Sequence, residues 1–317
     1  MGKNDLRGAE HGHEATGFLA AVVFVCLSVL RDVYLGAAVQ RITPLVLAAT
    51  AFTLCTLVFL PTGLHSRQSM TAFRSRPGYL LWVNVTSAGA WITFLYALKL
   101  IEPAIVQILY SGIGPLSVIW VEGYRTRGKR AVGLTLAERV SCGVLLTALV
   151  FAAVVVLSGR SGSGPQPIGE RVVGVLLAIA GGVFISVSTM LCRKLNDAGA
   201  TPCAVLAFRY PGAAIVATIA TAYSSASLPK GLGWIDGALL AATALIVVSS
   251  YVNQVAISLA SPLTVRVVLA VAPAFIFVLQ MVEGRLITSP YSLLAAVVYG
   301  CAAVSAAIVR WLAVREI

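Results

Sequence analysis

Apolar residues fill ten stretches of this 317-residue chain, each close to 20 residues long, and short polar or charged segments separate them. About 20 apolar residues are what an α-helix needs to cross the hydrocarbon core of a bilayer. The pattern predicts ten transmembrane helices, at residues 17–40, 43–64, 78–99, 103–122, 136–158, 171–192, 202–223, 235–258, 262–282 and 288–310. The first stretch does not have the form of a cleaved signal peptide, because it continues past Arg31 and Asp32 without a small-residue cleavage motif.

The composition excludes a water-soluble protein. Hydrophobic residues make up 59% of the chain and charged residues 11%, whereas globular domains have about 25% charged residues. If the N-terminus is cytoplasmic, fourteen Lys and Arg residues lie in the inner segments and six in the outer ones. We therefore expect both termini in the cytoplasm and a bacterial inner membrane as the location. The net charge of +11 is then mostly this positive-inside bias, which attraction to anionic lipid reinforces, and no nucleic-acid motif accompanies it.

The two halves of the chain share a sequence pattern. Thr43-Pro44 recurs as Thr201-Pro202, and Pro115 recurs as Pro273, in both cases 158 residues later. Because each copy has an odd number of spans, the second copy must enter the membrane from the opposite side. This predicts an all-α membrane protein built as a 5+5 inverted-topology repeat: a tail at 1–16, repeats at 17–158 and 171–312, a Gly/Ser/Pro-rich linker at 159–170, and a tail at 313–317. Such repeats place a substrate site near the midplane of the membrane.

Two segments carry a resemblance to a known family. They are YALKLIEPAIVQILYSGIGPLSVIWVEG at 96–123 and NQVAISLASPLTVRVVLAVAPAFIFVLQMVEGRL at 253–286. With the duplication, they make the chain resemble the drug/metabolite transporter superfamily in its ten-helix, EamA-like form. The resemblance implies a secondary transporter of small metabolites with a cavity between two helix bundles. The first half departs from the family pattern, since Glu122 comes early and a basic insertion, YRTRGKRAVG, precedes the fifth span.

Charged side chains within the spans are the strongest candidates for function, because a charge in lipid is costly. Arg31, Arg209 and Arg266 outnumber the one clear acid, Asp32. This excess of positive charge favours an anionic or zwitterionic cargo bearing a carboxylate or phosphate, and Asp32 is the candidate for proton coupling. The alternative is that these arginine side chains extend to lipid headgroups, which the depth of Arg31 in its span makes less favourable there than for Arg209 and Arg266. Glu122, at a helix end beside a basic loop, is expected to form an interfacial ion pair.

Polar side chains at helical spacing add further candidates for the substrate site. They are Asn84, Trp91, Gln107, Tyr110, Tyr251 and Gln254. Each stripe either lines a cavity or forms hydrogen bonds between helices.

Small residues and prolines mark candidate hinges within the spans. They are Gly112, Gly114, Pro115 and Pro273. Close helix packing is the alternative, and for the glycines it is the interpretation we favour.

Other function classes fit less well. Gly159-Arg160-Ser161-Gly162 matches the serine motif of rhomboid proteases, but no histidine follows His65 to act as a base within the membrane. No phosphate-binding loop for ATP and no ring of charge typical of a channel is visible. We therefore expect no enzyme, no cofactor and no metal site. The prediction is a secondary active transporter working by alternating access, as a monomer or homodimer, with an exporter of drugs or other xenobiotics as the alternative.

Overall fold

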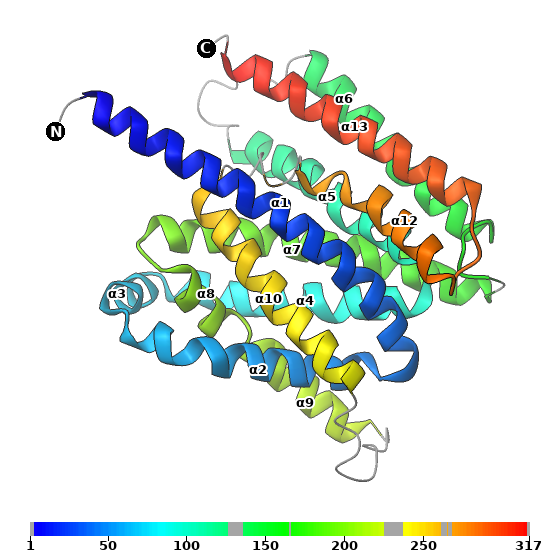
Figure 1. The fold of residues 1–317 in the computed structure, drawn as a ribbon, viewed down its shortest axis with the longest axis horizontal. Coiled ribbons are helices and arrows are strands. Elements are labelled where there is room, and N and C mark those ends of the chain that lie inside the picture. The colour runs from blue at the N-terminus through cyan, green and yellow to red at the C-terminus, as the bar shows by residue number, and fades with distance from the viewer. Residues whose placement is uncertain are drawn as a thin grey trace.

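The computed structural model describes residues 3–125, 136–164, 166–224, 237–260, 265 and 268–315. Within these ranges every regular element is helical and no strand occurs. The helices are α1 Lys3–Arg41, α2 Pro44–His65, α3 Arg67–Ser75, α4 Pro77–Leu100, α5 Pro103–Arg125, α6 Leu136–Leu157, α7 Ile168–Asp197, α8 Pro202–Arg209, α9 Pro211–Tyr223, α10 Gly237–Leu259, α12 Ala272–Glu283 and α13 Pro290–Arg315 (Figure 1).

Seven of the described segments are long and apolar enough to cross a membrane. They are Thr16–Arg41, Pro44–His65, Pro77–Leu100, Arg139–Leu157, Ile168–Asp197, Pro202–Tyr223 and Gly237–Leu259. Shorter apolar helices lie at Pro103–Gly114, Ala272–Glu283 and Pro290–Ala306. The chain therefore has the helices of a multi-pass integral membrane protein.

The outward faces of these helices are apolar, as contact with lipid requires. On α6, for example, Leu146, Val150 and Val154 are exposed, while Leu149 and Ala152 are buried. In a soluble protein such a continuous exposed apolar face would be a site of association. Around a helical membrane protein it is the surface that meets the acyl chains.

The observed helices differ from the predicted spans in several places. In the stretch predicted as one span at 262–282, the described residues turn at 270–271 and α12 begins only at Ala272. α1 begins at Lys3, within the segment expected to be a tail. Residues 67–75 form α3, a short amphipathic helix that the search for long apolar stretches did not predict. The stretch predicted as one span at 202–223 is divided into α8 and α9, because Pro211 has no backbone N–H to continue the helical hydrogen bonds.

Neighbouring helices pair across the two halves of the sequence. α1 packs along α10, and α4 packs along α7; α5 contacts α7, and α1 contacts α12. α6 pairs with α13, and α2 packs against both α8 and α9. α1 begins and α13 ends on the same side of the bundle (Figure 1). We call this side the N/C end, and the side where α1 ends and α13 begins the opposite end.

Candidate functional site

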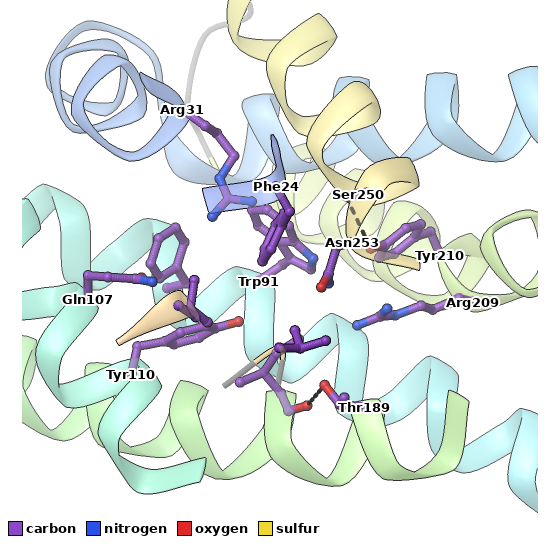
Figure 2. A pocket seen from close by; sticks show the side chains of 14 residues that line it. Phe24, Arg31, Trp91, Gln107, Tyr110, Thr189, Arg209, Tyr210, Ser250 and Asn253 are labelled. Carbon is purple, nitrogen blue, oxygen red and sulfur yellow. Dashed lines mark hydrogen bonds between the residues drawn. The ribbon is translucent and has the colours of Figure 1, made fainter. Parts of the chain in front are cut away.

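A cavity of about 50 Å³ lies inside the bundle, between helices of both halves (Figure 2). Its walls come from α1, α4, α5, α7, α8, α10 and the segments next to them: Phe24, Arg31, Trp91, Phe94, Gln107, Tyr110, Ile185, Thr189, Arg209, Tyr210, Ser250, Asn253, Val265 and Leu269. One water molecule needs roughly 10–15 Å³ of such space. The cavity in this conformation therefore has room for a few waters, and a metabolite would require it to open.

Arg31 enters the cavity from α1 with its charge already compensated. Its Nε and Nη2 lie 2.8 and 2.7 Å from Asp32 Oδ1, and its Nη1 donates to Ser249 Oγ of α10 at 3.1 Å. Adjacent helical positions point about 100° apart, so the guanidinium reaches the carboxylate by folding back along its own helix. Asp32 is fully buried and is not among the residues that line the cavity.

Arg209 is the last residue of α8, and its guanidinium points into the cavity from the side facing Arg31 (Figure 2). Only 1% of its surface is exposed. Its Nε donates to Ser87 Oγ at 2.8 Å and its Nη1 to Gln254 Oε1 at 3.4 Å. Within the described part of the chain no carboxylate lies within ion-pair distance of it. Arg209 is therefore a buried cation held by neutral partners.

Asn84 on α4 supports the break that positions Arg209. Its Nδ2 donates to Phe208 O at 2.6 Å, and its Oδ1 accepts from Gly212 N at 2.9 Å. These two backbone groups flank Pro211 and lose helical partners at the break. In a bilayer an unsatisfied backbone group costs several kcal/mol, so one amide side chain makes this interruption stable. Asn84 thus bonds between helices and does not line the cavity.

Aromatic rings form much of the cavity wall. The Arg31 guanidinium lies 5.1 Å from the Trp91 ring and 5.9 Å from the Phe94 ring, distances at which a cation is attracted to an aromatic face. Phe94 in turn contacts Tyr110 with ring centroids 4.8 Å apart. An apolar or planar part of a ligand would therefore meet rings on this side.

Gln107 supplies a polar group from α5. Its side chain points toward the cavity (Figure 2) and is 2% exposed. Its Oε1 has no hydrogen-bond partner in the described part of the chain. A buried amide oxygen without a partner is unfavourable, so a donor on a bound molecule, or a water, would stabilise it.

The residues predicted for the site are distributed as follows. Five of them line the cavity: Arg31, Trp91, Gln107, Tyr110 and Arg209. Gln254 is not among the lining residues, and its Oε1 accepts a hydrogen bond from Arg209 Nη1. Tyr251 stacks on Phe59 at 5.6 Å on the partly exposed side of α10. Arg266 lies outside the described residues.

The predicted hinge residues lie in continuous or closely packed helix. α5 runs unbroken through Gly112 and Gly114, and a Cβ at Gly112 would collide with Leu149 and Tyr299. The side chain of Pro115 lies outside the described residues. Pro273 is in the first turn of α12, where proline fits without breaking the helix.

Sequence patterns did not indicate the other lining residues. Phe24, Phe94 and Leu269 look like any apolar residue of a membrane helix, and only packing directs them inward. Tyr210 had a detectable signal, because it stands between a buried arginine and a Pro-Gly pair within a predicted span.

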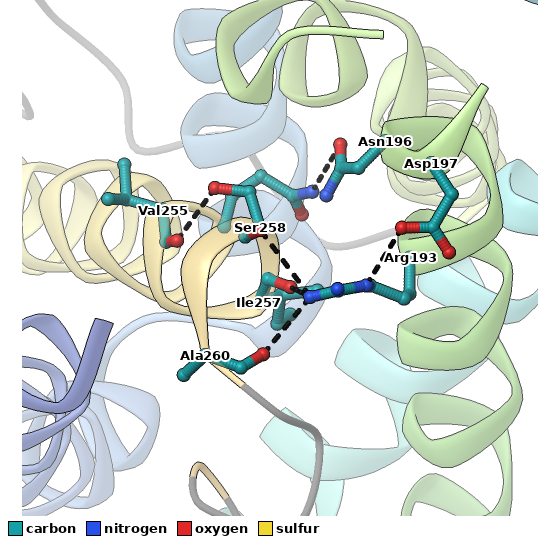
Figure 3. Close-up of polar contacts among 8 residues, drawn as sticks. Arg193, Asn196, Asp197, Val255, Ile257, Ser258 and Ala260 are labelled. Carbon is teal, nitrogen blue, oxygen red and sulfur yellow. Dashed lines mark hydrogen bonds and ion pairs between the residues drawn. The ribbon is translucent and has the colours of Figure 1, made fainter. Parts of the chain in front are cut away.

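Arg193 of α7 contacts the end of α10 at the N/C end of the bundle. Its Nη1 donates to Ile257 O at 2.8 Å and to Ala260 O at 3.0 Å, and its Nε bonds Asp197 Oδ1 at 3.0 Å (Figure 3). The carbonyls belong to the C-terminal end of α10, which has no helical N–H to bond them. Arg193 therefore ties α7 to α10 at this end.

Comparison with known proteins informs the fold alone. No family model matches the chain, and no curated protein matches it. Fifteen solved chains match. One of them, described as "Crystal structure of protein", superimposes with a TM-score of 0.64 at 21% identity, over 94% of this chain and 99% of that one. The arrangement of helices therefore exists in an experimental structure, and at this identity the likeness carries no function.

Proposed function

We propose that this chain is a secondary active transporter of a small anionic or zwitterionic metabolite, in the drug/metabolite transporter superfamily. The observation that carries the proposal is Arg209, a buried guanidinium at a cavity wall with no carboxylate partner in the described part of the chain. A positive charge placed this deep within membrane helices is expensive. A bound cargo with a negative charge would offset this free-energy cost.

The donors of Arg209 suit a carboxylate or phosphate. A guanidinium has five N–H groups, and Ser87 and Gln254 accept from two of them. Two of the remaining donors can bond both oxygens of one carboxylate. Arg31 does not compete for the same anion, because Asp32 already neutralises it. One net positive charge therefore favours a cargo with one negative group.

The rest of the cavity suits the other parts of such a cargo. The rings of Trp91, Phe94 and Tyr110 offer an apolar wall, and the Gln107 carbonyl offers an acceptor for an amine or hydroxyl. An amine is the natural partner of this oxygen if the cargo is zwitterionic.

The helix contacts support a 5+5 inverted repeat. In such a repeat α1 corresponds to α7, and α4 corresponds to α10. The contact between α1 and α10 then corresponds to the contact between α7 and α4, and both contacts are present. The contact of α5 with α7 likewise becomes that of α12 with α1. Two related halves around one cavity provide the two conformations that alternating access needs. In the positive-inside orientation the N/C end faces the cytoplasm, which suits the inner membrane of a bacterium.

An exporter of cationic drugs is the second candidate, and Arg209 argues against it. A cationic drug in this cavity would lie beside an uncompensated positive charge. The aromatic wall is the feature that favours it, since rings also attract cations.

A binding screen separates the two candidates. Detergent-purified protein would be heated with carboxylates, phosphorylated sugars and amino acids on one side, and with the lipophilic cation tetraphenylphosphonium on the other. A ligand of the folded state raises the melting temperature. Stabilisation by members of the anionic or zwitterionic set supports the proposal, and stabilisation by the cation alone refutes it.

A further inference from the structure

A buried acid lies at the opposite end of the bundle, away from Arg31 and Arg209 of the cavity. Glu102 precedes α5 directly, is 2% exposed, and was not among the predicted site residues. Its Oε2 accepts a hydrogen bond from Gly162 N at 2.8 Å and from Ser292 Oγ at 2.6 Å. The carboxyl group thus joins the start of α5, the loop after α6 and the start of α13.

The loop at Gly162 is fixed around this carboxyl group. Ile287 N donates to Gly162 O at 3.2 Å, and Ser289 Oγ donates to Arg160 O. A Cβ at Gly162 would collide with Ile287 O and come within 3.3 Å of Glu102 Oε2. Only glycine fits this position, so the contact with Glu102 depends on close backbone approach.

Among the residues that the structure describes, no cation pairs with Glu102. Charged side chains on the elements around it are Arg41, Lys99, Arg160, Glu170, Arg171, Glu283 and Arg285. In the described part of the chain none forms an ion pair with Glu102, and Arg285 pairs with Glu283. Arg171 donates to the carbonyls of Leu157 and Gln166, while Arg160 lies over the titratable ring of Tyr291, at 5.0 Å. Lys99, Arg41 and Glu170 are exposed.

Burial without a cation favours the neutral acid. Desolvation raises the pKa of Glu102, against the smaller effects of the Ser292 and Gly162 hydrogen bonds, which lower it. A proton on Oε1 leaves Oε2 able to accept both of those bonds, so the neutral acid satisfies the same contacts. When the junction opens and water reaches the carboxyl group, its affinity for the proton falls.

Glu102 is connected to the cavity by α5. Gln107 follows it by five residues, which is about 7.5 Å along a helix, and Tyr110 follows by eight. Both side chains line the cavity. A shift of the first turn of α5 would therefore move part of the cargo site.

We propose that Glu102 is a proton-binding site, and that its protonated form holds the start of α5 against Gly162 and Ser292. Loss of the proton releases this end of α5. The consequence for cargo rests on the function proposed above, whereas the proton site does not, because it can be tested without cargo.

Spin labels would measure the junction directly. One label replaces Lys99 at the end of α4 and the other replaces Ile287, both exposed, in a background where Cys26, Cys142, Cys203 and Cys301 are changed to Ser. Distances would be compared at about pH 5 and about pH 9, since a buried glutamate can titrate as high as about 8–9. We expect the distance to lengthen by about 2 Å or more at the higher pH.

The Glu102→Gln variant keeps an acceptor oxygen and cannot lose a proton. In this variant the distance between the two spin labels should stay short at both pH values. Glu170→Gln, an exposed acid at the same end, is the matched control and should respond as the parent does. A parent distance that does not change with pH overturns the proposal. So does a Glu102→Gln variant that still responds to pH, or one that is open at both values.

Discussion

Arg209 Nε donates a hydrogen bond to Ser87 Oγ at 2.8 Å, which joins the end of α8 to the middle of α4. Ser87 Oγ also lies 2.8 Å from Ser188 Oγ of α7. The guanidinium is thereby fixed by hydroxyl groups that orient it and leave its charge in place. This arrangement suits a cation whose counter-ion arrives with the cargo.

Replacing Arg209 should weaken anion binding in a graded way. A hydrogen bond to a charged group contributes about 1.5–3 kcal/mol. Arg209→Gln should therefore lower the affinity for a stabilising anion by about 10- to 100-fold. Arg209→Lys keeps the charge without the planar fork and should lose less. Titration calorimetry with the most stabilising anion measures both. Unchanged affinity in Arg209→Gln would remove Arg209 from the site.

The Arg31–Asp32 pair should be needed for stability as a pair. Asp32→Asn leaves a buried guanidinium without its counter-charge, and breaking such a pair costs about 3–5 kcal/mol. The double variant Arg31→Met with Asp32→Asn removes both charges and should be more stable than Asp32→Asn alone. Unfolding in detergent of four proteins, the parent, Asp32→Asn, Arg31→Met and the double variant, gives the coupling energy. If the losses in unfolding free energy of the two single variants simply add up to the loss in the double variant, the pairing is contradicted.

Asn84→Ala should destabilise the break between α8 and α9. It leaves Phe208 O and Gly212 N without their side-chain partners, at a cost of roughly 1–3 kcal/mol for each group. It should also weaken anion binding, because Arg209 adjoins Phe208. Thr86→Ala, which removes a hydrogen bond within α4 itself, is the control and should leave binding intact. Equal binding by all three proteins would mean that Asn84 does not position Arg209.

Gly112 should behave as a packing residue. A methyl group there meets Leu149 and Tyr299, so Gly112→Ala should cost about 1–3 kcal/mol. Gly143 lies on α6, the helix that carries Leu149, and has open space around it. Gly143→Ala should therefore be neutral or slightly stabilising. Comparable melting temperatures for the two variants would argue against the tight contact at Gly112.

The buried acid predicts how stability varies with pH. The fold raises the pKa of Glu102 above its ordinary value of 4.5, so its contribution is fully present below pH 4.5 and is lost as the pH rises through the raised value. The melting temperature of the parent should fall relative to that of Glu102→Gln over this range. If the melting temperature of the parent instead rises relative to that of the variant as the pH rises, the fold favours the charged form of Glu102.

The sequence predicted an all-helical membrane protein correctly, because lipid imposes a simple requirement on the length and polarity of the helices that cross it. It missed the break at Tyr210, although Pro211 and Gly212 are visible within that span. It also missed α3, whose nine residues are too few and too polar to cross a bilayer.

The charged residues of the site were easier to predict from the sequence than the apolar residues around them. Arg31 and Arg209 stand out because a charge inside an apolar helix has few structural explanations. Phe24 and Phe94 carry no such signal, because their inward direction depends on how α1 and α4 pack. Glu102 was hidden by its position between two spans, where an acid is normally solvated; its burial follows from contacts with Gly162 and Ser292, distant in the sequence.

Counterflow in proteoliposomes tests the central claim most directly. Vesicles loaded with the most stabilising anion would receive a labelled trace of the same anion outside. The account predicts saturable uptake that the internal anion accelerates, and loss of this uptake in Arg209→Gln. Uptake that rises linearly with concentration, ignores the internal anion, or persists unchanged in Arg209→Gln would contradict it.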